Sequence, residues 1–288
     1  MDALINYFET IPTAVRALIL MGGIFVFWVM EGVIPLKDFQ YRKVRHAGMN
    51  LMFTLFTTVI GFGLAGVLYF TSSWTAKHSF GLLYLVDLPL WVHVIAALLL
   101  LDLIGAWLIH WVEHKVQWMW KFHLVHHSDT TVDVTTGLRH HPGETVFRIL
   151  FTIAGVFVLG VPIGMVMLYQ SLSVLFAHLT HANIAMPDRL DRALSWVFVT
   201  PNMHKVHHHY QQPLTDTNYG NIFAVWDRVF GTYARVDPGE LVYGIDTHMN
   251  PEEHDRAGNL LKIPFQAYRP PTGSKFGGKE KEKEKEKE

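Results

Sequence analysis

The chain has 288 residues, of which 50% are hydrophobic and only 17% are charged, and its formal net charge is −1. This composition, gathered in long apolar blocks, excludes an ordinary soluble domain. The balanced charge gives no sign of a nucleic-acid partner. A sequence with no cysteine forms no disulfide, binds no metal through thiolates and has no thiol nucleophile.

Three apolar blocks are long enough to cross a hydrocarbon core of roughly 30 Å as helices. They comprise residues 14–34, 47–70 and 88–109. The first block lacks the basic start and the small-residue cleavage site of a signal peptide, so we expect it to be a retained span.

The loops between these blocks differ in charge. The loop after the first block carries Lys37, Arg42, Lys43 and Arg45, whereas the loop after the second block offers only Lys77. By the positive-inside rule the first loop is cytoplasmic. The third span should therefore end with His110 at the cytoplasmic face.

A fourth apolar stretch, residues 149–177, is too long for one crossing but falls short of the roughly 40 residues that two full crossings need. Gly160, Pro162 and Gly164 interrupt its middle, where they weaken a helix. We expect a kinked helical hairpin that enters the membrane and returns. The predicted fold is an all-α, multi-pass membrane bundle with about four membrane-embedded helices and a cytosolic helical cap.

Histidines crowd into the second half of the chain. Of 18 histidines, 13 fall between His110 and His209. They are grouped as His110/His114, His123/His126/His127, His140/His141, His178/His181 and His204/His207/His208/His209. Spacings of three and four place side chains on one face of a helix, so members of a group can share a metal. Imidazole suits Zn, Cu, Fe and Ni, and the ligand type alone does not choose among them.

Four other histidines, His46, His78, His248 and His254, lie among basic or loop residues and are expected at the surface. At about 100° per residue, the triplet that starts at His123 faces away from His110 and His114 on one straight helix. The chain must therefore bend between residues 115 and 122 for both groups to converge. Tryptophan prefers the headgroup zone, and Trp111, Trp118 and Trp120 suit an elbow at the membrane interface.

The number of imidazoles points to two metal ions, because nine or ten candidate ligands exceed what one ion takes. Neutral ligands leave the metal charge uncompensated, so carboxylates are expected to orient the imidazoles through their outer nitrogens. The candidates are Asp102, Glu113, Asp129, Asp133, Glu144 and Asp227. Asp102 lies inside a predicted span, where an acidic residue is suspicious by itself.

One further local signal concerns the last histidine group. Thr200 should cap a helix whose first turn begins with Pro201, because proline at that position loses no needed hydrogen-bond donor. This would place His204, His207 and His208 on a helix near its N-terminal end.

Two other function classes stay open at this point. Residues 110–114, HWVEH, match the H-x-x-E-H pattern of a zinc hydrolase, although that pattern needs one further ligand and leaves many histidines unexplained. A membrane metal-binding or transport protein would also place histidines near its spans, but with ligands at the membrane midplane.

In order along the chain, HWVEH (110–114), HLVHH (123–127), HLTHAN (178–183) and HKVHH (204–208) resemble the histidine boxes of the fatty acid hydroxylase/sterol desaturase superfamily. RHHP (139–142), NYG (218–220) and WDRVFGTY (226–233) add to the resemblance, which covers about residues 98–233. It implies an integral membrane monooxygenase or desaturase with a non-haem di-iron centre, which uses O2 to hydroxylate or desaturate a C–H bond of a sterol, fatty acyl or related lipid.

The resemblance also implies the site. The iron ligands would be His110, His114, His123, His126, His127, His204, His207 and His208, with His181 and His178 as alternatives or partners in the fourth position. His141 would support the ligands together with Asp102, Glu113, Asp129 and Asp227. No cytochrome b5-like haem segment is recognisable in the chain, so we expect electrons from a separate electron-transfer protein.

The expected organisation has four parts: N-terminal transmembrane helices (1–97), a histidine-box catalytic domain with the hairpin (98–240), a C-terminal extension (241–271) and a charged tail (272–288). Alternating Lys and Glu in the tail cannot build a core, so we expect disorder there.

Overall fold

The computed structural model describes residues 1–276, and this part of the chain is all-α, with isolated β-bridges but no extended strand. The predicted disorder of residues 277–288 lies outside the described residues. The α-helices are α1 (Asp2–Glu9), α2 (Thr13–Val33), α3 (Lys43–Lys77), α4 (Leu90–Asp102), α5 (Ile109–Lys115), α6 (Gln117–His127), α7 (Pro142–Leu159), α8 (Ile163–His181), α9 (Asp188–Leu194), α10 (Pro201–His207), α11 (Val225–Val229), α12 (Pro251–His254) and α13 (Ala257–Leu260).

Short turns of helix connect these elements. The 3-10 turns are η1 (Leu82–Tyr84), η3 (Thr136–Leu138), η4 (Leu214–Asp216), η5 (Pro238–Glu240), η6 (Asp246–His248) and η7 (Ile263–Phe265), whereas η2 (Leu103–Leu108) is a π-helical turn. The turn η2 joins α4 to α5 without a break, so the helix of the third apolar block runs on to Lys115 and carries both His110 and His114.

Within residues 1–276, five helical segments are long and apolar enough to cross a membrane. They are Thr13–Val33, Lys43–Tyr84, Leu90–Lys115, Pro142–Leu159 and Ile163–His181. We predicted about four, and the difference lies in the last two. The arms of the hairpin begin before and end after the apolar stretch of residues 149–177, so each is a helix of 18 or 19 residues.

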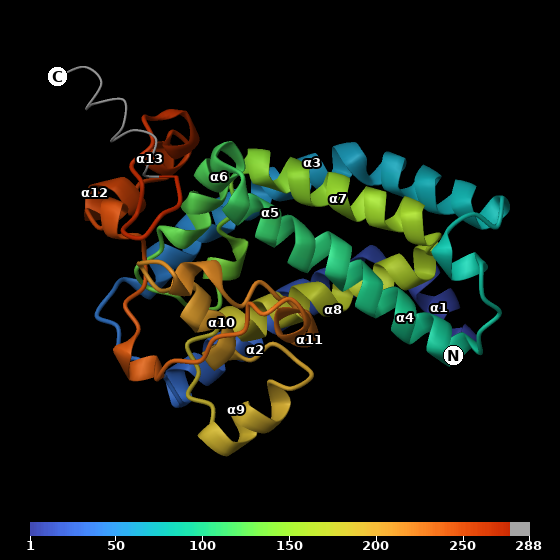
Figure 1. Ribbon diagram of the computed structural model, residues 1–288, viewed down its shortest axis with the longest axis horizontal. Helices are drawn as coiled ribbons and strands as arrows, with labels where there is room; N and C mark the ends of the chain where they lie inside the picture. Colours follow the sequence, from blue (N-terminus) through green and yellow to red (C-terminus); the bar gives the residue numbers. More distant parts are fainter. Residues whose placement is uncertain (277–288) are drawn as a thin grey trace.

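The predicted helix–turn–helix at Gly160–Pro162 is confirmed, and its return to the same side of the membrane stays a prediction. Gly160 ends α7 with a left-handed φ of 75°, and Pro162 precedes α8. A Cβ on Gly160 would lie 2.2 Å from the carbonyl oxygen of Phe80, so the close approach of the η1 loop also requires glycine. The two arms separate from this corner, and α4 packs against both of them (Figure 1).

The long helices run along the length of the molecule, and α6, α10, α12 and α13 gather at the end opposite the N-terminus (Figure 1). The predicted bend between the histidine pair and the triplet is confirmed, because Val116 is extended, with φ −112° and ψ 108°. At this elbow Trp118 is 56% exposed. The assignment of Trp120 to the membrane interface was wrong, since it is 2% exposed and packs against His114 and His127.

Residues 241–276 cover α6. Ile245, Leu260 and Ile263 pack with Trp120 and Leu124 in one apolar cluster. The tail was predicted to begin at residue 272, but residues 272–276 are held in place. The backbone N–H of Thr272 donates to Asp246 at 2.9 Å, and Phe276 packs against the same cluster.

Candidate metal centre

Nine histidines converge at the end of the bundle where α5, α6, α8 and α10 meet. The first histidine group consists of His110, His114, His123, His127 and His207. The second histidine group consists of His126, His181, His204 and His208. In each group one ring nitrogen per residue lies within 4.8 Å of all the others, and every member is buried.

The two H-x-x-H-H boxes each serve both groups. In α6, His123 and His127 join the first group and His126 joins the second. In the other box His204 and His208 join the second group and His207 joins the first. Consecutive residues of a helix point about 100° apart, and the adjacent pairs His126/His127 and His207/His208 direct their rings to different groups.

The last box is positioned as predicted. Thr200 caps α10, and its side chain accepts a hydrogen bond from the N–H of Met203 at 3.2 Å, with Pro201 in the first turn. His204 and His207 lie in this helix, and His208 is the residue directly after it. The cap therefore fixes the start of a short helix from which ligands reach both groups.

The outer nitrogens of several of these histidines are held by oxygen atoms that only accept. The Nδ1 atoms of His110, His207 and His181 donate to the carbonyls of Tyr219 (2.8 Å), Thr217 (2.7 Å) and Ala177 (2.7 Å). Nδ1 of His123 donates to Glu144 at 2.8 Å, and Nδ1 of His114 donates to Asp216 at 3.2 Å. A neutral imidazole with its hydrogen on Nδ1 presents an unshared electron pair at Nε2.

The Nε2 atoms of neighbouring histidines lie close together within each group. Nε2 of His123 lies 3.0 Å from Nε2 of His110 and 3.1 Å from Nε2 of His127. Nε2 of His181 lies 3.2 Å from that of His126 and 3.0 Å from that of His204. For His110 and His123, whose Nδ1 atoms both donate outward, the two Nε2 atoms carry unshared pairs that repel at this distance unless a cation lies between them. Imidazole nitrogens bound at about 2.1 Å to one ion are spaced in this way.

Orphaned nitrogens support the same fit. Nε2 of His114, His207 and His208 is buried and has no hydrogen-bond partner within residues 1–276. A buried polar atom without a hydrogen-bond partner destabilises the fold, and a bound cation would be the missing partner of these nitrogens. Burial also lowers the pKa of His204, His207 and His208 well below the usual histidine range, which keeps these rings neutral and ready to bind metal. The donor set thus fits a cation in each group.

His178 lies outside both groups. It is buried in α8, but it faces α2, where its Nδ1 would lie 2.9 Å from a Cβ added to Gly23. Of the two candidates in the fourth box, only His181 directs a ring nitrogen toward other box histidines.

The carboxylates that contact the outer nitrogens of the histidines are only partly those that the sequence predicted for this role. Glu113 lies 3.8 Å from Nδ1 of His123, but its closer partner is Arg148, at 2.6 Å. Glu144 is the direct partner of His123 and also accepts from Nδ1 of His140 at 2.7 Å. One carboxylate oxygen of Glu113 is thus engaged by Arg148.

Asp102 and Asp227 touch none of the box histidines. Asp102 accepts the backbone N–H groups of Ile222 (3.2 Å) and Phe223 (3.1 Å). Asp227 accepts those of Tyr219 (2.8 Å) and Gly220 (2.9 Å), together with the indole N–H of Trp107 (3.0 Å). Both carboxylates hold the loop whose Tyr219 carbonyl receives His110, so they act on the site through the backbone.

Asp129 also has a different role from the one expected. It binds His46 at 2.9 Å, and Asp133 binds the other nitrogen of the same ring at 3.1 Å. His46 was predicted at the surface, but it is buried at the start of α3 between these two carboxylates. The error arose because both partners lie more than 80 residues away in the sequence.

Two other surface predictions were wrong for a similar reason. His248 and His254 are buried within the folded C-terminal segment, and the backbone carbonyl of His254 accepts a hydrogen bond from Arg139 at 2.6 Å. His141 caps α7 by accepting from the N–H of Gly143 at 3.0 Å and faces Leu261, so it supports the fold and not the box histidines directly. His78 is exposed, as predicted.

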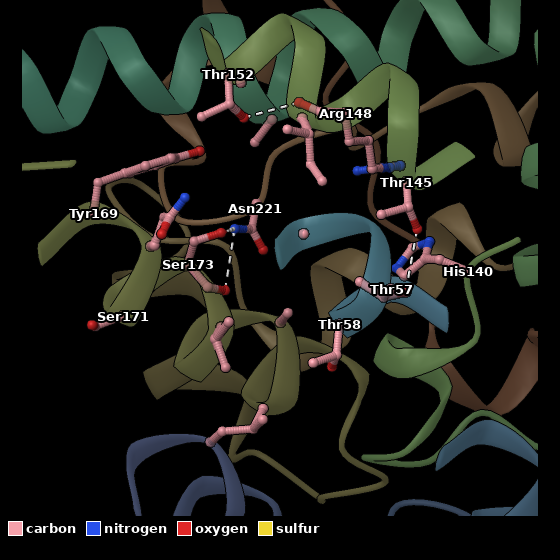
Figure 2. Close-up of a pocket in the computed structure, with 18 of the residues that line it drawn as sticks. Thr57, Thr58, His140, Thr145, Arg148, Thr152, Tyr169, Ser171, Ser173 and Asn221 are labelled. Carbon is pink, nitrogen blue, oxygen red and sulfur yellow. Dashed lines mark hydrogen bonds between the residues drawn. The ribbon is translucent and has the colours of Figure 1, made fainter. Parts of the chain in front are cut away.

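A cavity of about 670 Å³ opens beneath the two histidine groups. Five box histidines, His110, His123, His126, His181 and His204, line one end of it. The other walls come from α2, α3, α7 and α8. Figure 2 shows side chains from α3, α7, α8 and the loop of Asn221 around the space. The cavity therefore leads from the region of the membrane-spanning helices to the candidate metal centre.

Sequence inspection missed two important residues. Asp216 accepts from His114 and Lys115, and these contacts outweigh burial and lower the pKa of its carboxyl to about 2, but nothing in its local sequence points to that role. Arg148 lines the cavity and binds Glu144 and Glu113. Its signal was available, because His140, Glu144 and Arg148 follow one another at helical spacings of four.

Comparison with known proteins gives the same picture for the histidine-bearing segment. The sequence model of the fatty acid hydroxylase family matches residues 94–232. No solved structure matches the chain significantly.

Among curated relatives, an ornithine lipid hydroxylase of Rhizobium tropici is 28% identical over 145 residues, which cover 50% of this chain and 43% of the relative. An alkylglycerol monooxygenase of Xenopus tropicalis is 30% identical over 146 residues, covering 51% of this chain and 31% of the relative. A methylsterol monooxygenase of Arabidopsis thaliana is 27% identical over 165 residues, covering 56% and 61%. The chain thus spans less than half the length of the first two of these relatives. Apolar helices, histidine boxes in order and this family match together identify the chain as an integral membrane member of the fatty acid hydroxylase/sterol desaturase superfamily.

Proposed function

We propose that the protein is an O2-dependent, non-haem di-iron monooxygenase that hydroxylates a C–H bond of a membrane lipid. The observation that carries the proposal is the pair of buried histidine groups at the head of a cavity among membrane-spanning helices. The names of the relatives add support, since they are hydroxylases and monooxygenases of an ornithine lipid, an alkylglycerol and a methylsterol.

In this proposal each histidine group holds one iron through its Nε2 atoms. The ligands are His110, His114, His123, His127 and His207 for one ion and His126, His181, His204 and His208 for the other. Bound iron would reduce O2 and so provide an oxidant strong enough to attack an unactivated C–H bond. Electrons would come from a donor protein.

The chain supplies position and shelter for this chemistry. Carbonyl and carboxylate acceptors fix the tautomer and the orientation of the ligand rings, an arrangement that strengthens metal binding. Trp120 and Tyr219, both buried, pack against ring faces of the first group and keep water from it. The helical walls of the cavity would hold the lipid so that one carbon lies near the iron.

We place the site on the cytoplasmic side of the membrane. Lys37, Arg42, Lys43 and Arg45 lie in or beside the loop between α2 and α3, and an excess of Lys and Arg favours the cytoplasm. That loop is joined to the end of the bundle that carries the site, because the backbone N–H of Leu36 donates to the carbonyl of Asn183, two residues beyond α8.

The test is metal analysis followed by a search for product. The purified protein should contain iron at about two ions per chain and show no Soret band, which would exclude a haem protein. Incubation with a membrane lipid extract, a reductant system and 18O2 should yield a lipid that carries one labelled oxygen. Metal that exchanges across a vesicle membrane without any oxygenated lipid would instead establish a metal transporter.

A further inference from the structure

The polar side chains near the histidine end of the cavity are already paired with one another. Thr57 and Thr145 share a hydrogen bond of 3.2 Å, and the amide of Asn221 donates to Ser173 at 2.7 Å (Figure 2). Arg148 is taken by Glu113 and Glu144. These groups therefore shape the wall and have little capacity left for a ligand.

Arg16 and Gln170 differ from them. Both line the cavity, Arg16 from α2 and Gln170 from α8, yet neither side chain has a hydrogen-bond or ion-pair partner within the described chain. Arg16 is exposed and Gln170 is half-buried. Arg16 is the fourth residue of α2, so its long side chain can extend to the membrane interface and bind an anion there, because its charge is costly in an apolar surrounding.

The two residues lie at the same level of the bundle. The helices α2 and α8 run in parallel, since Pro35 after α2 pairs with Ile184 after α8, and Gly23 packs against Leu175 and His178. Counting back seven residues, or about two helical turns, from Gly23 leads to Arg16 on α2. The same step back from Leu175 and His178 leads to residues 168–171 on α8, which include Gln170. Arg16 and Gln170 thus face one cavity from neighbouring helices.

This level is far from the metal centre. Gln170 precedes His181 by 11 residues in the same helix, which corresponds to a rise of about 16 Å. A ligand that reaches from Arg16 to the histidines must therefore be long, with its polar end and its reacting carbon well apart.

We infer that Arg16 and Gln170 form a subsite for a single negatively charged headgroup, so that the substrate is an anionic, long-chain amphiphile oxidised at a carbon remote from its headgroup. Arg16 supplies the opposite charge and Gln170 supplies an amide N–H to a headgroup oxygen. The inference rests on the proposed function for the identity of the reaction, but the binding that it describes needs no iron and no turnover.

The test is direct binding to the full-length protein in nanodiscs of phosphatidylcholine, which is neutral overall. The probes are radiolabelled hexadecyl sulfate, 1-hexadecanol and hexadecyltrimethylammonium, which share one chain and differ in headgroup charge. We expect the sulfate to bind tightest and the ammonium weakest. Arg16→Gln should remove about five- to tenfold of the preference for the sulfate over the alcohol, and Arg16→Lys should restore most of it.

Arg45→Gln is the matched control, because Arg45 is an exposed arginine without a partner in the described residues and lies outside the cavity. Gly61→Trp tests the location. Gly61 lines the cavity with nothing within 4 Å of an added Cβ, so the indole should fill the space and weaken binding of all three probes.

Equal binding of the three probes by the parent protein, or an unchanged preference in Arg16→Gln, overturns the inference. Loss of the preference for the sulfate when anionic phosphatidylglycerol is added to the nanodisc also overturns the inference, since Arg16 would then bind a bulk bilayer lipid. Failure of the iron and 18O2 measurements with the charge preference intact would reject the proposed reaction and leave the subsite standing.

Discussion

His126 and His127 are neighbours in the chain but belong to different histidine groups. Their ring planes are 89° apart, with centroids separated by 5.4 Å. His207 and His208 repeat the relationship at 90° and 5.6 Å. Each doublet therefore ties the two groups together, and each of its members should serve a different ion.

This division predicts a partial loss of metal. His207→Ala removes a ligand of the first group and His126→Ala one of the second, so we expect either variant to lose about half of its iron and nearly all hydroxylation. Iron is measured by mass spectrometry on purified protein. His78→Ala, which changes an exposed histidine, is the control. Full iron and full activity in either variant would contradict the assignment at that position.

The fourth box offers a comparison between two buried histidines of one helix. His181→Ala should lower the iron content, whereas His178→Ala should retain it, because only His181 faces the second group. Both variants remove the same side chain from α8, so a general loss of folding would affect them alike. Loss of iron from His178→Ala together with retention by His181→Ala would reverse the assignment.

Glu144 should matter more for metal affinity than Glu113. Glu144→Gln removes the charge that holds Nδ1 of His123, and a loss of such an outer partner typically weakens metal binding about 10- to 100-fold. Competition with a chelator measures the affinity. Glu252→Gln, in an exposed helix, should behave as the parent. A weaker effect of Glu144→Gln than of Glu113→Gln would show that the hydrogen bond to His123 is not the decisive contact.

The conformation of the loop that carries Tyr219 should be stabilised by Asp227. In Asp227→Asn an amide NH2 would face backbone N–H donors, so we expect a loss of about 1–3 kcal/mol of stability. Thermal unfolding in detergent gives the measurement, and Asp87→Asn, at an exposed loop position, is the control. An unchanged Tm would mean that the loop is held by other contacts.

The hairpin predicts that residues 130 and 185 lie on the same side of the membrane. The chain has no cysteine of its own, so Thr130→Cys and Ala185→Cys can be labelled singly with an impermeant maleimide. Both should react from the same side, and Val86→Cys, between η1 and α4, should react from the other. Opposite sides for positions 130 and 185 would refute the hairpin and the single site with it.

The sequence by itself determined the features that depend on local spacing. Hydropathy marked the spans, the Gly160–Pro162 interruption marked the hairpin corner, and the angle between the pair and the triplet of histidines required the bend that Val116 provides. Thr200 and Pro201 predicted the start of a helix, because an N-cap hydrogen bond joins residues only three apart in the sequence.

Only the tertiary structure decided which histidines share a group, that His181 and not His178 faces the others, and that His46 lies buried between Asp129 and Asp133. The same holds for Asp216, whose partner His114 is 102 residues away in the sequence. Such contacts join separate helices, and helical spacing specifies the direction of a side chain relative to its own helix but not the position of the next one. The cavity and its unpaired Arg16 arise in the same way, from the packing of helices whose sequences show only that they are apolar.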